Sequence, residues 1–312
     1  MHLIISRIKD TWRVGKVASA LFLDIQATFS NMVKERLLHN MQSQRVPVKY
    51  VNLIAKMLTN HQTQLQFDNF ISEPIQLING TMQGCPLSML IYAFYHADLI
   101  DITKGKFELS TGFVDDCAFV AVVDTLDEAH KTLKNMMEWP NGRLNWLHSH
   151  NPPFEITRLV VIDFARTPND IASSPLVINR NQTYGSRSQH TISTVNNYKY
   201  LGVMFDPKLS WRAHITKVIT KTSHWMQLLW RLSKMASGLS PSKTCQLYNT
   251  ITIPALTYAC NVWYTPPINS TTAEMPEVRF VLPNSFNLSK PMPPDSSQVV
   301  YVKLPSISSK SM

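Results

Sequence analysis

Short apolar runs and acidic turns dominate the first half of the chain. The apolar run Ala18–Ile25 carries one acid near its end, which predicts a buried strand that presents Asp24 at its tip. The segment Phe107–Val123 has two apolar stretches on either side of Val114–Asp116, a pattern typical of a hairpin with acids at its turn. If these strands are neighbours in one sheet, the three carboxylates converge on one point.

Other segments show the apolar spacing of helices. Helices are predicted before Lys16 and over Asn31–Met41, Val48–Leu58, Leu87–Ile100 and Leu126–Trp139. The breaker Pro140–Gly142 ends the last of them. Short strands are predicted within Gln62–Phe67, Ile75–Gly84, Phe154–Phe164 and Ser193–Asp206. This mixture of helices and strands indicates an α+β fold.

The chain changes character after Pro207. Helical spacing continues there with an excess of Lys and Arg, and beyond Tyr264 the sequence is rich in Pro and Ser, which favours irregular or disordered chain. One apolar stripe predicts a packed helix face formed by Ile215, Val218, Ile219, Thr222, Trp225, Met226 and Leu229.

Charge points to a polyanionic partner. The 312 residues include 30 Lys and Arg against 21 Asp and Glu, giving a net charge of +9 and a pI near 9.4. Such an excess makes nucleic acid the first partner to consider. The four cysteines form no CxxC pair, and no stretch reaches the roughly 18 apolar residues of a membrane span. The sequence therefore predicts an intracellular protein that does not cross a membrane.

The three carboxylates are suited to hard divalent cations. Mg²⁺ takes oxygen ligands, usually one or two carboxylates plus substrate phosphates, and two such ions promote in-line phosphoryl transfer. A lone Asp pair is more often a solvated turn, but the framing apolar strands and Asp24 favour a metal site here. Between the acids, Gly80–Ser88 forms a glycine-containing loop that opens a helix, where backbone amides can approach an anion.

The order of three motifs resembles that of reverse transcriptases. The strings LDIQATFSN, GTMQGCPLS and FVDD are similar to motifs A, B and C of the family, above all in the fungal forms of its non-LTR (LINE-like) retrotransposon branch. Further similar blocks are NPPFEITRLVVIDFAR, YKYLGVMFDPKLSWRAHI and GLSPSKTCQLYNTITIPALTYACNVWY, so the resemblance covers about residues 5 to 264.

The resemblance implies a right-hand polymerase fold. It predicts an α+β palm, a small mostly antiparallel sheet backed by helices, followed by a helical thumb. The implied divisions are an entry helix over 1–22, the palm over 23–205, the thumb over 206–264 and a tail over 265–312. Since little sequence precedes Asp24, most of the fingers is expected to be missing, and the chain is expected to be a fragment.

The resemblance also implies roles for individual residues. Three residues match the family's metal-binding aspartates, which would hold two Mg²⁺ ions, with Mn²⁺ as an alternative: Asp24, Asp115 and Asp116. Those that match contacts to the incoming nucleotide are Phe29, which would exclude a 2′-hydroxyl, Gln83 and Gly84. Those that match contacts to primer and template are Phe113, Val114, Arg158, Tyr200, Leu201 and Gly202. Arg158 stands where a lysine is usual, so a role in protonating pyrophosphate is not implied for it.

Three functions remain open from the sequence. The leading one is an RNA-directed DNA polymerase domain, which would use an RNA template, a DNA primer and dNTPs, and which truncation could have inactivated. The second is a non-catalytic nucleic-acid-binding remnant of such an enzyme. The third is another palm-type nucleotidyl transferase or cyclase, against which the Gly80–Ser88 loop and the thumb blocks count. A nuclear location follows from family expectation, and no protein partner can be inferred.

Overall fold

The computed structural model describes residues 1–25, 29–82, 84–101, 105, 107–140, 142–150, 158–167, 172–181, 187–233, 238–264, 277–282 and 298–303. They belong to two compact units, Met1–Ser210 and Trp211–Met312. Among these described residues, no helix is long and apolar enough to cross a membrane.

A four-stranded antiparallel sheet lies at the centre of the first unit. Its strand order is β6-β7-β1-β8, with bounds Glu108–Phe113, Asp116–Val123, Val17–Asp24 and Val160–Phe164. Strand β1 is buried at every residue except its last, Asp24. Because an inner strand is covered on both faces, a largely apolar run is needed to fill it.

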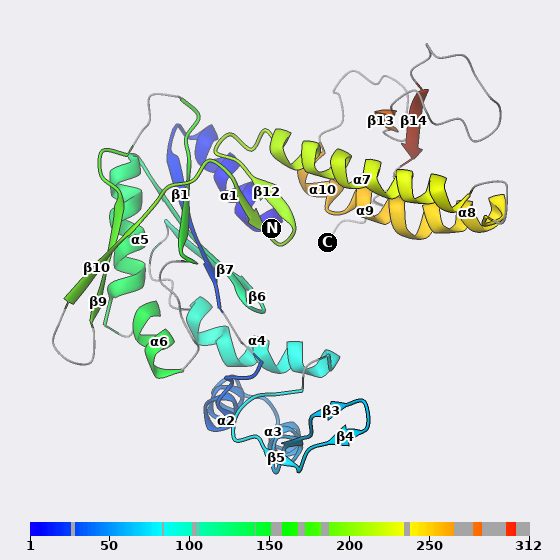
Figure 1. Cartoon of the computed structure of the whole chain (residues 1–312). Coiled ribbons are helices and arrows are strands. Elements are labelled where there is room, and N and C mark those ends of the chain that lie inside the picture. The colour runs from blue at the N-terminus through cyan, green and yellow to red at the C-terminus, as the bar shows by residue number, and fades with distance from the viewer. Residues whose placement is uncertain are drawn as a thin grey trace. The chain divides into compact units, whose positions relative to one another are not determined.

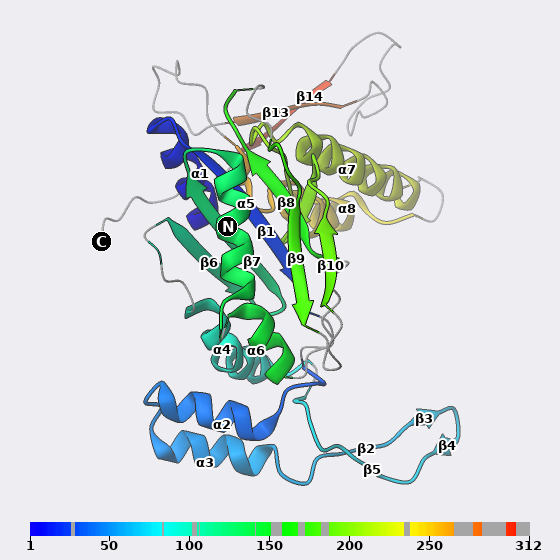
Figure 2. The same ribbon diagram turned by 90° about the vertical axis from the view of Figure 1, so that its left-hand side faces the viewer.

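Helix α5 (Leu126–Glu138) covers one face of the sheet (Figures 1 and 2). Its buried side chains join the same core cluster as Leu21 and Leu23 of β1. The helix begins at a Thr125 cap whose hydroxyl accepts a hydrogen bond from the amide of Glu128 at 3.3 Å. Its buried apolar residues are Leu126, Ala129, Leu133, Met136 and Met137.

Helix α1 (His2–Arg13) and the hairpin of β11 (Tyr198–Tyr200) and β12 (Val203–Phe205) lie on the opposite face (Figure 1). Side chains alternate along β1, so Phe22 points to this second face. Its ring stacks on Tyr198, with centroids 4.8 Å apart. The two faces of one strand therefore anchor two separate layers.

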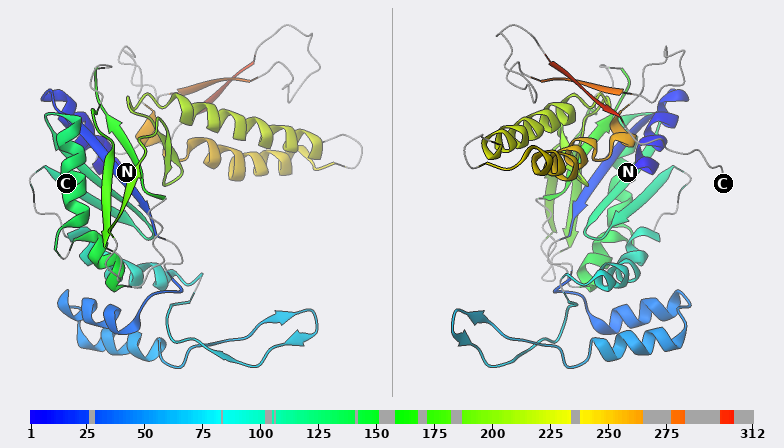
Figure 3. Two further views of the ribbon diagram at one scale, coloured as in Figure 1. Left: turned by 60° about the vertical axis from the view of Figure 1, so that its left-hand side comes forward. Right: turned by 90° about the vertical axis from the view of Figure 1, so that its right-hand side faces the viewer.

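Three helices and a long hairpin lie between β1 and β6 in the chain. Helices α2 and α3 pack side by side, and α2 also contacts α4; their bounds are Lys34–Ser43, Val48–Met57 and Pro86–Asp101. A hairpin extends away from α2 and α3 (Figure 3) and is built from β2 (Gln62–Thr63), β3 (Gln66–Phe67), β4 (Phe70–Ile71) and β5 (Ile75–Gln76).

The second unit is mainly helical. A long helix, α7 (Arg212–Leu232), is followed by the shorter segments α8 (Pro241–Leu247), η2 (Tyr248–Thr252), α9 (Ile253–Thr257) and α10 (Cys260–Trp263). The predicted stripe on α7 is buried at Val218, Thr222, Met226 and Leu229. Ile219 is 45% exposed and lies outside that face, so its prediction as a packed residue was wrong.

Several elements differ from the prediction. Strands β13 (Glu277–Leu282) and β14 (Gln298–Lys303) pair within the tail that was expected to be irregular. Both contain β-branched and aromatic residues, whose strand preference outweighs the surrounding prolines locally. Helix α6 (Arg143–Ser149) and the pair β9 (Leu176–Asn181) and β10 (Arg187–Ile192) were not predicted. The mixed α+β class is confirmed, while the division into palm and thumb stays a prediction.

Candidate active site at the acid turn

Backbone register brings the predicted acids to one end of the sheet. Asp24, the last residue of β1, is the direct cross-strand partner of Asp116, the first residue of β7. The amide of Ile25 donates a hydrogen bond to the carbonyl oxygen of Asp115 at 3.1 Å. The two segments that carry the acids are therefore tied together by the sheet ladder and by one bond beyond it.

The turn itself is strained at Val114. Phe113 pairs with Asp116, which leaves Val114 and Asp115 as a two-residue loop. Val114 has φ of 57°. A β-branched residue seldom adopts this left-handed region, and such strain clusters at functional sites. Phe113 is 55% exposed, so its ring is open to solvent beside the acids.

Negative charge is concentrated at this turn. Burial, together with the charges of Asp115 and Asp24, raises the pKa of Asp116 to about 6, while Lys199 opposes the shift. Like charges disfavour each other's ionised forms when they share a site. A guanidinium nitrogen of Arg158 donates to Asp24 Oδ2 at 3.0 Å. Arg158 is thus placed beside a predicted metal ligand.

The donor set suits a hard cation in its chemistry. Three carboxylates offer the oxygen ligands that Mg²⁺ prefers, and the pKa of Asp116 is raised by burial and by the charges of Asp115 and Asp24. Across the described residues, however, no three His, Cys, Asp or Glu side chains are gathered closely enough to hold a metal ion. The strands bring the acids to one place without closing them into a finished site.

The loop that precedes α4 packs against the chain after β1. The amide of Thr81 donates to the carbonyl oxygen of Phe29 at 2.7 Å, and that of Gly80 donates to Met32 at 2.8 Å. Gly80 has φ of +100°, and a Cβ there would lie 2.9 Å from the carbonyl oxygen of Ser30. Glycine is therefore required both by conformation and by the closeness of the two segments.

Phe29 sits against the helix that this loop opens. Its ring meets Tyr92 of α4 edge to face, with centroids 5.8 Å apart. The hydroxyl of Ser88 donates to the carbonyl oxygen of Met82 at 2.6 Å and lies 2.9 Å from the Thr81 hydroxyl, which closes the loop onto the helix start. Gly84 has φ of +81°, and a Cβ added there would meet no described atom within 4 Å apart from its chain neighbours. Gln83 lies outside the described residues.

The remaining predicted residues lie in the β11–β12 hairpin, on the face of the sheet opposite α5 (Figure 1). Leu201 and Gly202 form its two-residue turn with φ of 46° and 84°, as a type I′ turn requires. Tyr200 is buried and packs near Phe22, with ring centroids 5.1 Å apart. Its hydroxyl donates a long hydrogen bond, 3.5 Å, to the carbonyl oxygen of Asp116. This hairpin is thereby joined to the acid turn.

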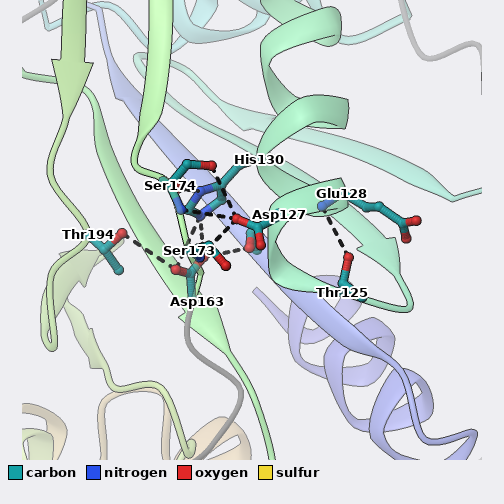
Figure 4. A network of polar contacts seen from close by, with 9 residues as sticks. Thr125, Asp127, Glu128, His130, Asp163, Ser173, Ser174 and Thr194 are labelled. Carbon is teal, nitrogen blue, oxygen red and sulfur yellow. Dashed lines mark hydrogen bonds and ion pairs between the residues drawn. The ribbon is translucent and has the colours of Figure 1, made fainter.

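A buried polar network on the same sheet was not foreseen. His130 of α5 lies between two acceptors: its Nε2 is 3.0 Å from Asp163 Oδ1 and its Nδ1 is 3.0 Å from the carbonyl oxygen of Ser174 (Figure 4). Ser19 of β1 donates to the same carboxylate at 2.5 Å. A cavity of about 530 Å³ adjoins His130 and Asp163, away from the acid turn. The available signal was the position of His130 on the apolar face of its helix.

Comparison with known proteins gives relatives over most of the chain. It is 26% identical over 274 residues to "Probable RNA-directed DNA polymerase from transposon X-element" of Drosophila melanogaster. It is 25% and 23% identical to "RNA-directed DNA polymerase from mobile element jockey" of Drosophila funebris and Drosophila melanogaster. The chain is therefore similar to these RNA-directed DNA polymerases over most of its own length. Each match covers 84% of this chain, and the chain spans 28% of the length of each relative.

The chain was also compared with protein-family models and with solved structures. No protein-family model matches the chain. Among solved structures, apo telomerase from Candida tropicalis truncated from the C-terminal domain aligns with a TM-score of 0.43 and 9% identity, over 66% of this chain and 38% of that chain. Telomerase from Candida albicans in complex with a fragment of telomeric RNA aligns with a TM-score of 0.35 and 12% identity, over 71% and 39%.

Proposed function

We propose that the chain is the palm and thumb of an RNA-directed DNA polymerase of a non-LTR retrotransposon. The observation that carries the proposal is the register that sets Asp24 opposite Asp116, with Asp115 bonded to Ile25. The similarity to polymerases of mobile elements supports the same reaction class. The substrates would be an RNA template, a DNA primer and dNTPs.

In this proposal Asp24, Asp115 and Asp116 would hold two Mg²⁺ ions. When bound, such ions supply positive charge that stabilises the attacking and leaving oxygens of phosphoryl transfer. The protein's own part is to hold three carboxylates at the end of a rigid sheet. Arg158, 3.0 Å from Asp24, would limit repulsion among the acids before substrate arrives.

The neighbouring segments would position the substrates. Phe29, held by the Gly80–Thr81 contact and by Tyr92, would lie under the incoming sugar and exclude a 2′-hydroxyl. Gly84, whose surroundings leave room for a close approach, would border the nucleotide together with Gln83. The exposed Phe113, the strained Val114 and the hairpin of Tyr200, Leu201 and Gly202 would place the primer end.

Primer extension tests the proposal. With poly(rA)/oligo(dT), dTTP and Mg²⁺, the wild-type chain should extend the primer, and Asp115→Ala should reduce the rate by at least about 100-fold because catalytic charge stabilisation is lost. Asp124→Ala is the matched control, since Asp124 follows the other end of β7 and pairs with Lys16 at 3.0 Å. Equal rates of primer extension for wild type and Asp115→Ala would contradict the proposal.

A second candidate function is nucleic-acid binding without catalysis. The observation that favours it is the ion pair between Arg158 and Asp24, which engages one of the three acids with a basic side chain. This candidate expects salt-sensitive binding of an RNA–DNA duplex, because phosphate contacts release counterions. Binding that persists in Asp115→Ala, with no incorporation by either protein, would favour it over the polymerase.

Two narrower assignments stay predictions. The fungal branch was inferred from the motif strings, whereas the relatives named above are from Drosophila. The nuclear location rests on family expectation.

A further inference from the structure

A fully buried arginine grips the hairpin that carries the acid turn. Arg143, the first residue of α6, has no exposed side-chain surface. One guanidinium nitrogen, Nη2, donates to the hydroxyl of Ser110 on β6 at 2.5 Å. The guanidinium carbon lies 4.4 Å from the ring centroid of Phe119 on β7. Ser110 and Phe119 are direct cross-strand partners, so one side chain contacts both strands of the hairpin at the same level.

The same side chain ties the hairpin to α5. Its Nη1 donates to the carbonyl oxygen of Met136, in the last turn of that helix, at 2.8 Å. Phe119 is also the cross-strand partner of Leu21 in β1. A row of residues across three strands is therefore fixed to the end of α5 by Arg143.

The local chain is built to deliver this side chain. Gly142 precedes Arg143, and a Cβ at Gly142 would lie 2.7 Å from the carbonyl oxygen of Trp139. Only a residue without a side chain allows the chain to turn back so tightly after α5. Arg143 is thereby buried against β6, β7 and the end of α5.

Burying a charge here is costly, which indicates a specific need. Burial lowers the pKa of Arg143 to about 10, against the opposing charge of Glu108. A buried ion that is only partly compensated is destabilising compared with an apolar residue of similar size. A methionine at this position would fill the same space, whereas the planar guanidinium of arginine can bind three elements at once.

We propose that Arg143 is a positioning residue that holds the β6–β7 hairpin against α5, so that Asp115 and Asp116 stay opposite Asp24. Arg143 acts through β6 and β7 and does not touch the acids. The expected effect of Arg143 on catalysis rests on the proposed polymerase function. Its role in holding the hairpin against α5 rests on the contacts alone.

The bond from the Ile25 amide to the carbonyl oxygen of Asp115 reports directly on this positioning. Hydrogen exchange at the Ile25 amide should be at least about 10-fold faster in Arg143→Met than in wild type, while amides in the middle of β1 keep their protection. Arg13→Met is the matched control, because Arg13 is exposed and pairs with Asp10 within the same helix. Unchanged exchange at Ile25, or equal acceleration along all of β1, would overturn the proposal.

A milder variant covers the case in which Arg143→Met does not fold. Ser110→Ala removes one partner of the guanidinium and leaves the core apolar, so the Ile25 amide should again exchange faster, by a smaller factor. If it exchanges as in wild type, Arg143 does not act through β6. Arg143→Lys should fall between wild type and Arg143→Met, since an ammonium cannot bind Ser110, Met136 and Phe119 together.

Catalysis provides a second readout that separates the two claims. In primer extension, Arg143→Met should raise the Mg²⁺ concentration for half-maximal rate by about 10-fold, as expected when ligand geometry is loosened. A wild type that makes no product contradicts the proposed polymerase, and exchange at Ile25 then still decides the positioning role. An active wild type with unchanged Mg²⁺ dependence in Arg143→Met contradicts the link between Arg143 and the acids.

Discussion

Individual residues at the acid turn are held in unfavourable states by the surrounding fold. Val114 adopts a backbone conformation that β-branched residues avoid. Asp116 has its pKa raised by burial and by the neighbouring charges of Asp115 and Asp24. Both features cost stability in the free protein, and both lie at the metal site proposed above.

At this scale, Asp116→Asn should stabilise the free protein. The raised folded pKa means that the stability contributed by protonated Asp116 is complete below its ordinary pKa of 3.8 and is lost as the pH rises through about 6. At pH 7.5 the variant should therefore gain about 1 kcal/mol in urea unfolding, a value reduced because the side chain is partly exposed. Asp124→Asn, at an exposed ion pair, should change little. A loss of stability in Asp116→Asn would contradict the charge assignment.

At the scale of elements, close backbone contact joins the segment after β1 to the loop before α4. The amides of Gly80 and Thr81 bond to Met32 and Phe29. This contact fixes Phe29 relative to the start of α4, although more than 50 residues separate Phe29 from Thr81 in the chain. The placement of Phe29, which is predicted to contact the nucleotide, therefore depends on one glycine.

Gly80→Ala tests that dependence. The new Cβ would meet backbone oxygens of Phe29 and Ser30 at 3.0 and 2.9 Å, in addition to the conformational cost of positive φ. We expect a loss of more than about 2 kcal/mol in urea unfolding. Gly15→Ala is the matched control, because Gly15 also has positive φ, +73°, but open space around it. It should lose only about 1 kcal/mol. Equal losses would show that the contact at Gly80 does not matter.

The His130–Asp163 network joins α5, β1 and β8. Burial by itself lowers the pKa of His130, but the hydrogen bond and charge of Asp163, with the Ser174 carbonyl oxygen, outweigh it and raise the pKa. Both ring nitrogens face acceptors, so the protonated ring satisfies both contacts. The network thereby holds one charged pair within the sheet layer.

His130→Gln should remove a pH-dependent part of the stability. Because the folded pKa is raised, this contribution is complete below the ordinary pKa of histidine, 6.5, and is lost as the pH rises through the folded value. The difference in unfolding free energy between wild type and His130→Gln should therefore shrink as the pH rises above 6.5. His39→Gln, at an exposed position of α2, is the control. A difference that grows with pH would contradict a raised pKa.

Across the whole molecule, the order of the motifs predicted more of the function than the local pattern of apolar residues did. The strand ending at Asp24, the hairpin around Val114–Asp116 and the helix after Pro86 could be predicted because apolar runs and turn residues mark them. Residue roles came from the resemblance and stay predictions. Arg143 gave no local signal, since nothing in its own segment shows that Ser110 and Phe119 would surround it. His130 could have been noticed, because it follows Leu126 by one helical turn on the buried face.

In the proposed function, Asp24 and Asp116 act together in one polymerase site. Single-turnover primer extension with Asp24→Asn, Asp116→Asn and the double variant tests this joint action. Residues that act as a unit are strongly non-additive, so the double variant should be about as slow as either single variant, each at least about 100-fold below wild type. Losses that multiply in the double variant, or wild-type rates in either single variant, would contradict the account.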